Sequence, residues 1–574
     1  SSGVKASSKT KNKIRQELYL QKDTIVNFQH KESTYNDYGV QPLLQHGFSN
    51  QGPGLAVGDL NADGLDDVFM GGAYGFKSSF ILQDKNGNFN AHELPATDVY
   101  EDLGALIFDS NGDGLADIYV VSGGSERYEG HVGYQDRLYL NNPENVGTFI
   151  EGSLPEMKTS TTTVVGGDYD NDGDIDLFVG GRVQVGKYPN NPRSYILENV
   201  DGNFVDVTDK FSPSLLKIGM VTSAIWTDTN NDHYLDLVVV GEFMPITILM
   251  GNGKELEVST INGLQNTHGL WNSILADDFD NDGDIDFIVG NRGLNSTLKG
   301  TLEKPLQLHY ADFDSNGYVD PILSSFEEGF YRPVASLDQL TSQLPIAKKK
   351  VLFYHSYAKA TTNDILKMLD ITAYENLESK EMNSSYLENV GEGKFEISPL
   401  PITTQFAPVY GIISEDLDGD GLQDVILVGN EYNTEVVNGR YDASFGTILI
   451  NHGSGEFKTS PNLESGFSVK GNAKSLIRLE VGETSVLMVG KNDDTVETFK
   501  FKGTSTTTIK PITSEQYALI HFKDGTQRKV EFYWGQGYLS QSSRNIRCTK
   551  NMSSITMYTQ SGEISRQINL EVIK

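Results

Sequence analysis

The stretch GDYDNDGDIDLFVGG at residues 167–181 joins five aspartates in a glycine-containing turn to a run of apolar residues. Numbered from Asp168, its pattern is D-x-[DN]-x-[DN]-G-x-x-D, with oxygen-bearing side chains at positions 1, 3, 5 and 9. Alternate residues of a tight loop direct their side chains to one centre, and Ca²⁺ takes about six to eight oxygen ligands. Glycine at position 6 permits the sharp turn. The stretch therefore predicts a calcium-binding loop followed by a β-strand.

The same phrase occurs seven times along the 574 residues, with first acids at 59, 109, 168, 228, 278, 312 and 416. The successive spacings are 50, 59, 60, 50, 34 and 104 residues. Each phrase follows an apolar run and precedes a β-branched one, and a second hairpin often comes next, as in SYILENVDGNF at 194–204. Two hairpins per unit of this length are typical of a four-stranded propeller blade.

Each phrase offers the same predicted ligands, which are the side chains at positions 1, 3, 5 and 9 and the backbone carbonyl at position 7. The fourth phrase is irregular because His233 replaces the glycine, and the sixth because Asn316 stands at position 5. Carboxylates held this close repel one another without a cation, so we expect metal binding to be coupled to folding.

We predict about seven Ca²⁺ ions, one for each phrase. The predicted ligands are Asp59, Asn61, Asp63, Leu65, Asp67, Asp109, Asn111, Asp113, Leu115, Asp117, Asp168, Asp170, Asp172, Asp174, Asp176, Asp228, Asn230, Asp232, Tyr234, Asp236, Asp278, Asp280, Asp282, Asp284, Asp286, Asp312, Asp314, Asn316, Tyr318, Asp320, Asp416, Asp418, Asp420, Leu422 and Asp424.

An EF-hand begins with the same residues, but it needs a bidentate glutamate at position 12 and a helix on either side. Position 12 is apolar in all seven phrases and lies inside a predicted strand. It is occupied by Met70, Val120, Val179, Val239, Val289, Leu323 and Leu427. The phrases are therefore predicted to be hairpin loops, and not the helix–loop–helix sites of calcium sensors.

The chain is thus predicted to be all-β, with a calcium-binding β-propeller of seven blades, or of eight if the phrase at 312 begins its own blade. We expect the last blade to lack a metal phrase and to be completed by a strand within residues 24–30. A capping-box pattern, Ser336 to Gln339, predicts a helix in the longest spacing. The predicted divisions are a polar basic linker (1–23), the propeller (24–508) with a small helical insertion (about 334–376), and a small C-terminal β domain (509–574).

Composition limits the function further. Acidic residues outnumber basic ones by 78 to 46, a net charge of −32, which argues against nucleic acid as a partner. Cys548 is the only cysteine, so neither a disulfide framework nor a cysteine-based zinc site can form within the chain. No apolar run reaches the roughly 18 residues of a transmembrane helix. Residues 1–16 lack the apolar centre of a signal peptide, and we expect any export signal to lie upstream.

The metal phrases, with Gly-Gly or Gly-Asn closing the strand that follows, resemble the FG-GAP/VCBS repeats of integrin-α-like propellers. The segments GQGYLSQS at 535–542 and SITMYTQSG at 554–562 are similar to the ASPIC/UnbV domain, although Tyr558 stands where that family often has tryptophan. The combination resembles VCBS-repeat proteins of Bacteroidota-type bacteria. This resemblance implies a secreted or cell-surface protein, on the external face of the bacterial outer membrane and in some cases beside nutrient-uptake systems.

We interpret the chain as a non-enzymatic, calcium-stabilised cell-surface binding module for a protein partner or a glycan, such as an accessory subunit of an outer-membrane uptake complex. Aromatic residues of the face loops are candidate contacts: Tyr128, Tyr134, Phe243, Phe330 and Tyr331. The alternative is a calcium-dependent polysaccharide lyase or a hydrolase on a propeller, with His268 or His355 as a base. No HExxH, GxSxG or Cys–His motif occurs, and no catalytic residue is predicted.

Overall fold

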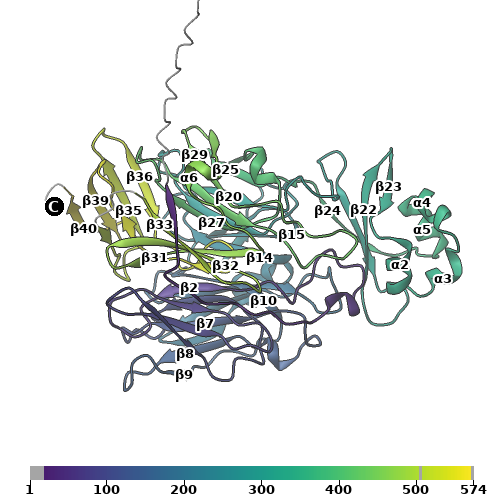
Figure 1. Ribbon diagram of the computed structural model, residues 1–574, viewed down its shortest axis with the longest axis horizontal. Coiled ribbons are helices and arrows are strands. Elements are labelled where there is room, and N and C mark those ends of the chain that lie inside the picture. The colour runs from purple at the N-terminus through teal and green to yellow at the C-terminus, as the bar shows by residue number, and fades with distance from the viewer. Residues whose placement is uncertain (1–18, 503–506, 571–574) are drawn as a thin grey trace, which may run out of the picture.

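The computed structural model describes residues 19–502 and 507–570 of the chain. Among these residues β-strands dominate, from β1 to β40, and the six α-helices are only four to seven residues long. Figure 1 shows the propeller between the insertion helices at one end and the C-terminal sheet at the other. The predicted all-β fold is confirmed. Within the described ranges, no helix has the length and apolar character needed to cross a membrane.

Seven antiparallel sheets form a closed ring, the architecture of a β-propeller. Each sheet contains a first, second, third and fourth strand side by side, and its first strand contacts the first strand of the next sheet. The ring closes where β31 contacts β2. The first strands are β2 (Leu55–Gly58), β6 (Asp102–Phe108), β10 (Ser160–Gly167), β14 (Met220–Thr227), β19 (Ser273–Asp277), β27 (Val409–Glu415) and β31 (Ala473–Val481).

The other three strands of each sheet follow outward from the ring axis. The second strands are β3 (Asp67–Met70), β7 (Asp117–Ser122), β11 (Asp176–Val183), β15 (Asp236–Met244), β20 (Asp286–Gly290), β28 (Asp424–Gly429) and β32 (Thr484–Lys491). The third strands are β4 (Ser79–Gln83), β8 (Arg137–Asn141), β12 (Tyr195–Val200), β16 (Thr247–Gly251), β25 (Ser385–Asn389), β29 (Thr447–Asn451) and β33 (Glu497–Phe501). The fourth strands are β5 (Phe89–Glu93), β9 (Phe149–Glu151), β13 (Asn203–Asp206), β17 (Leu256–Val258), β26 (Phe395–Pro399), β30 (Phe457–Ser460) and β1 (Leu20–Asp23).

Burial falls from the first strand to the fourth. Every residue of β10 and β11 is buried, whereas four of the five residues of β5 are exposed. A strand that is buried on both faces needs apolar residues without polar alternation, which explains the apolar runs after the metal loops. The core lies between neighbouring sheets, where Val238 and Val240 of β15 pack with Ile274 and Phe287 of the next sheet.

The strand that completes the last sheet lies earlier than predicted. β1 pairs with β33, with Leu20 opposite Phe501, so the propeller begins before residue 24 and the predicted boundary is wrong. Leu20 is fully buried in the core of this sheet, which anchors the strand there. Residues 24–30 instead contribute only an isolated bridge between Gln29 and Thr495. Residues 1–18 of the predicted linker lie outside the described ranges.

The sixth metal loop belongs to a separate sheet of order β23-β22-β21-β24, inserted between β20 and β25. This sheet lies outside the ring, because β19 contacts β27 directly. Its strands are β21 (Leu306–Ala311), β22 (Asp320–Glu327), β23 (Phe330–Pro333) and β24 (Glu375–Ser379). Four helices follow β23: α2 (Leu337–Gln343), α3 (Ala347–Lys350), α4 (Tyr354–Lys359) and α5 (Thr362–Met368). The predicted capping box of Ser336 and Gln339 is confirmed at the start of α2.

Residues 507–570 form a four-stranded sheet of order β36-β35-β39-β40, beside a two-stranded pair, β34 and β38. The bounds are β34 (Thr508–Ile509), β35 (Tyr517–Phe522), β36 (Gln527–Glu531), β38 (Ile546–Arg547), β39 (Met552–Tyr558) and β40 (Ile564–Asn569). Short elements elsewhere are α1 (Thr208–Phe211), α6 (Asn462–Ser465), β18 (Gly269–Leu270) and β37 (Ser540–Gln541). The segment between β36 and β38 leaves this sheet and enters the propeller, as described below.

Candidate metal centres and the C-terminal sheet that covers them

The seven metal phrases form hairpin loops of one backbone shape. In every loop the residue before position 1 pairs with the aspartate at position 9. The backbone has a positive φ at positions 4 and 6 of all seven loops. His233, at position 6 of the fourth loop, adopts a φ of 71° where the other loops have glycine. The irregular fourth loop therefore keeps the shape of the regular ones.

The aspartate at position 1 organises the turn. In the first loop, its two carboxylate oxygens accept hydrogen bonds from the backbone N–H of Asp63 at 3.0 Å and of Gly64 at 2.8 Å. The same two bonds recur in the second, third, fourth and sixth loops. Because the same two bonds recur, the side chain of position 1 is held against the turn in the same way in these five loops.

The aspartate at position 9 has a second, purely structural task. One oxygen of Asp176 accepts a hydrogen bond from the backbone N–H of Tyr169 in its own loop, and the other accepts one from the backbone N–H of Asn199, 2.8 Å away on the third strand. Equivalent pairs occur at Asp67, Asp117, Asp236, Asp286 and Asp424. Position 9 therefore joins six of the seven loops to the third strand, whereas Asp320 of the sixth loop accepts from Gln343 Nε2 of α2 instead. The sequence pattern does not reveal this link.

Four of the loops bring three carboxylates within 4.8 Å of one another, counted over the described residues. In the third, sixth and seventh loops these are positions 1, 3 and 9, and in the fifth they are positions 1, 3 and 5. The first, second and fourth loops have asparagine at position 3 and so offer fewer carboxylates. The grouping of side chains at positions 1, 3, 5 and 9 is thus reproduced in part, and the carbonyl ligands at position 7 stay a prediction.

The donor set fits a hard divalent cation. Burial, together with the neighbouring carboxylates of Asp170 and Asp168, raises the pKa of Asp176 to about 9. The buried oxygens Asp278 Oδ1 and Asp314 Oδ1 have no hydrogen-bond partner in the structure. Buried, mutually repelling carboxylates with unpartnered oxygens are the arrangement that a calcium ion would satisfy.

The C-terminal sheet rests on the metal loops. The backbone N–H of Lys529 donates to Asp278 Oδ2 of the fifth loop at 2.9 Å, and its ammonium donates to Asn231 Oδ1 of the fourth loop at 2.8 Å. Lys510 pairs with Asp66 of the first loop, and Gln560 donates to the Asp168 carbonyl of the third loop. Arg528 and Asn551 donate to the carbonyls of Gly421 and Gly419 in the seventh loop. Any cation that orders these loops therefore also orders the surface on which the C-terminal sheet sits.

A segment of the C-terminal part, residues 534–543, occupies the axis of the propeller. It contacts the first strand of all seven sheets, through bonds or ring contacts of Leu55, Ile107, Gly166, Ser223, Ile274, Tyr410 and Leu476. Tyr538 is buried there against Leu103 and Tyr410. Sequence reasoning missed this channel segment; the apolar pair Tyr538-Leu539 between glycine and serine residues was its only local signal.

The other candidate residues are dispersed. Tyr134 and Phe243 are buried, so the prediction that they contact a partner is wrong, whereas Tyr128 is 74% exposed. The Tyr134 hydroxyl donates to the carbonyl of Arg127 at 2.8 Å, which explains its burial. His268 precedes β18, and its pKa is lowered by burial; His355 lies on α4.

Comparison with known proteins is consistent with this architecture. The family described as FG-GAP-like repeat matches residues 109–179, which contain the second and third metal loops. Together with the ring of sheets, this match supports an FG-GAP β-propeller, the kind of scaffold found in binding modules. No curated protein matches the chain in sequence.

Solved structures similar to the chain share little sequence with it. One is YCF48 bound to D1 peptide, with a TM-score of 0.38 and 9% identity, covering 83% of this chain and 98% of that one. Another is Sqt1 of Saccharomyces cerevisiae, with a TM-score of 0.37 and 12% identity, covering 83% and 100%. A third is the Dos1 propeller, with a TM-score of 0.35 and 8% identity, covering 77% of each chain. The assignment of the fold rests on the sheet topology described above.

Proposed function

We propose that this chain is a non-enzymatic, calcium-stabilised binding module at the cell surface. The seven sheets of the ring are its blades, and the seven loops hold about seven Ca²⁺ ions. The observation that carries the proposal is the common geometry of the loops, which have one register, one pattern of positive φ and oxygen donors alone. Loops of this type suit the roughly 10⁻⁴ to 10⁻³ M affinities of extracellular modules, which implies a calcium-rich exterior.

The proposal extends to the domains and the setting. Residues 509–574 form an ASPIC/UnbV-like domain, and the chain belongs on the external face of a bacterial outer membrane of the Bacteroidota type. Its partner is a protein of that surface, such as an outer-membrane transporter that it serves as an accessory subunit, or a glycan. The docking of the C-terminal sheet on the metal loops supports a single rigid body that presents its outer surfaces to such a partner.

The insertion offers the best contact surface. We define the insertion tip as residues 346–359, which contain four lysines and no acid in a chain of net charge −32. Leu352, Phe353 and Tyr354 are 66%, 61% and 64% exposed there. Helices α3 and α4 of the tip lie at one end of the molecule (Figure 1). Adjacent exposed apolar side chains favour burial against a partner, and the lysines favour an acidic one.

A pull-down from native membranes tests the proposal. We expect the chain to capture an outer-membrane protein or an acidic glycan in Ca²⁺, and to lose it when chelator loosens the loops. The triple variant Leu352→Ser, Phe353→Ser, Tyr354→Ser should weaken capture at least tenfold. The control is Val436→Ser with Val437→Ser, because these apolar residues are even more exposed, at 89% and 73%, but lie outside the tip. Equal capture by both variants would remove the tip from the proposal, and release of unsaturated sugars from a polysaccharide panel would reject a non-enzymatic role.

A further inference from the structure

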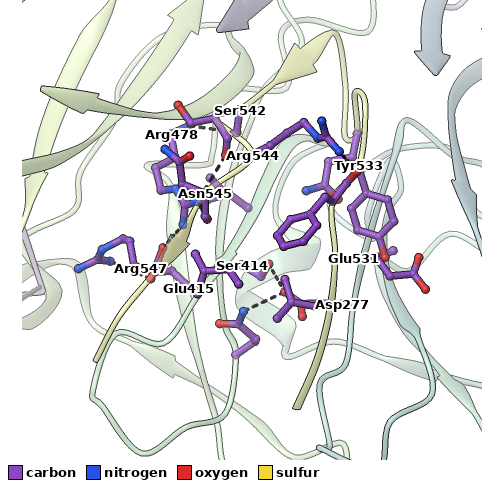
Figure 2. A pocket seen from close by; sticks show the side chains of 18 of the residues that line it. Asp277, Ser414, Glu415, Arg478, Glu531, Tyr533, Ser542, Arg544, Asn545 and Arg547 are labelled. Atoms are coloured by element: carbon purple, nitrogen blue, oxygen red, sulfur yellow. Dashed lines mark hydrogen bonds and ion pairs between the residues drawn. The ribbon is translucent and has the colours of Figure 1, made fainter. Parts of the chain in front are cut away.

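The C-terminal sheet and the propeller enclose a polar cavity of about 110 Å³. Its wall is built from β36 and the segment after it, and from the first strands β19, β27 and β31. Figure 2 shows Arg478, Glu415 and Arg547 at one side of the cavity and Tyr533 with Glu531 at the other. None of the predicted calcium ligands lines this cavity, although Gln423 of the seventh loop belongs to its wall.

Two of the four arginines in the wall, Arg478 and Arg547, share a single carboxylate, that of Glu415. The Glu415 carboxylate accepts from Arg478 Nη1 and from Arg547 Nη1, each at 2.8 Å. The flanking positive charges hold the pKa of Glu415 below its ordinary value against the opposing effect of burial. The carboxylate of Glu415 is therefore fully used within this triad, which keeps a net charge of +1.

The other two arginines bond only to backbone carbonyls. Arg528 Nη1 donates to the Gly421 carbonyl at 2.9 Å, and Arg544 Nη2 donates to the Phe532 carbonyl at 3.1 Å. The Nε atoms of both arginines are buried and have no hydrogen-bond partner. Burial lowers the pKa of Arg544 to about 9, so its guanidinium stays charged at neutral pH. Arg528 is attracted by the nearby carboxylates of Asp277 and Asp416, but for Arg544 burial is opposed by no carboxylate. A buried charge of this kind is costly, which points to a missing anion beside Arg544.

The remaining carboxylates of the wall do not pair with Arg544, although Asp277 lies near enough to attract Arg528. Glu531 already accepts from the Lys529 ammonium at 2.9 Å and from Thr227 Oγ1 at 2.7 Å. Asp277 accepts from Ser414 Oγ at 2.6 Å and from Gln423 Nε2 at 3.0 Å. The wall therefore carries a surplus of positive charge inside a chain whose net charge is −32.

We propose that this cavity binds a small anion, a carboxylate or an inorganic oxyanion, between Arg544 and Arg528. The guanidinium fork matches the planar, bidentate geometry of such a group. Asn545 Nδ2, another buried donor without a partner, lies in the same wall. Water could fill the cavity, but it would not neutralise the guanidinium groups. The anion joins the C-terminal sheet to the propeller strands that complete the wall.

Tryptophan fluorescence provides the readout, because the Arg544 guanidinium stacks 3.6 Å from the centroid of the Trp534 ring. The calcium-saturated full chain is titrated with sodium acetate and with sodium sulfate, each against sodium chloride at matched ionic strength. We expect a saturable change in emission and a rise in melting temperature with acetate or sulfate. The Trp534→Phe variant should lose the emission change and keep the rise in melting temperature.

Three variants separate binding from folding. Arg544→Gln should weaken anion binding at least tenfold, and Arg544→Lys, which keeps the charge without the fork, by a smaller factor. Arg566→Gln is the matched control, because Arg566 lies on β40 and pairs with Glu515 outside the cavity. The affinity of the Arg566→Gln variant for the anion should equal that of the unaltered chain. An unsaturable response shared with chloride, or equal affinity in Arg544→Gln and Arg566→Gln, would overturn the proposal.

Discussion

At the scale of single residues, the metal phrase contains aspartates of two kinds that the pattern alone does not distinguish. Position 3 accepts at most a single backbone hydrogen bond within its loop, as Asp170 does from Asp172 at 3.2 Å. Position 9 accepts one bond from its loop and one from the third strand, as Asp176 does. The first kind has little task besides the proposed cation, whereas the second also stabilises the sheet.

This difference predicts two different variants of the third loop. Asp170→Asn should reduce the rise in melting temperature that Ca²⁺ produces. In the presence of a chelator, the melting temperature of this variant should differ little from that of the unaltered chain. Asp176→Asn should lower the free energy of unfolding in both conditions, by about 1–3 kcal/mol, because one buried N–H loses its carboxylate acceptor. Thermal unfolding with and without Ca²⁺ measures both. Identical behaviour of the two variants would contradict the division of tasks.

The buried pair of Glu431 and Lys474 makes a second residue-scale prediction. Their charged atoms are 2.8 Å apart, and their side chains are 3% and 1% exposed. Burial alone would raise the pKa of Glu431, but the Lys474 ammonium and the Tyr410 hydroxyl lower it from 4.5 to about 2. A lowered folded pKa gives stability that is complete above about pH 4.5 and is lost as the pH falls toward 2.

Glu431→Gln should therefore cost about 3–5 kcal/mol at pH 7, because the buried Lys474 ammonium loses its carboxylate partner. The difference from the unaltered chain should shrink as the pH falls below 4.5. The double variant Glu431→Leu, Lys474→Met should regain most of the loss. Urea unfolding from pH 7 to pH 3 checks this, and a difference that does not change with pH would contradict it.

At the scale of elements, short sequence patterns predict the strands and helix ends that depend on interactions between residues near in sequence. The strands around each loop, the capping box before α2 and the alternating strands of the C-terminal sheet follow from short stretches of sequence. The closing strand was misplaced by several residues, because its position depends on Leu20 finding the core of a sheet more than 450 residues away in the chain. The channel segment was not predicted at all, since its few apolar residues show no strand period.

The channel segment should be an energetic link between the C-terminal sheet and the ring. Tyr538 is buried, with its ring centroid 4.7 Å from that of Tyr410. Tyr538→Ala should lower the free energy of unfolding by about 3–5 kcal/mol, as expected for removal of a buried aromatic side chain. Tyr128→Ala, at an exposed position, should change it by less than about 0.5 kcal/mol. A small effect at Tyr538 in urea unfolding would show that the segment is only loosely held.

At the scale of the whole molecule, the acidic loops and the C-terminal sheet that rests on them form one connected structure. The predicted ligands of each loop are near in sequence, so the loops could be recognised without a structure. The contacts of Lys529 and Gln560 with three different loops could not, because they join residues 251 to 392 positions apart. Calcium in these loops would both reduce the repulsion among carboxylates and order the seat of the C-terminal sheet.

The central claim is that the seven hairpin loops are calcium sites, and the number of bound ions tests it most directly. Equilibrium dialysis of the full chain against radioactive Ca²⁺ at millimolar concentration counts them even where affinity is modest. We predict about seven ions per chain, and about one fewer in the variant Asp168→Asn, Asp170→Asn of the third loop. A count of one or none, or a count that this variant leaves unchanged, would contradict the account.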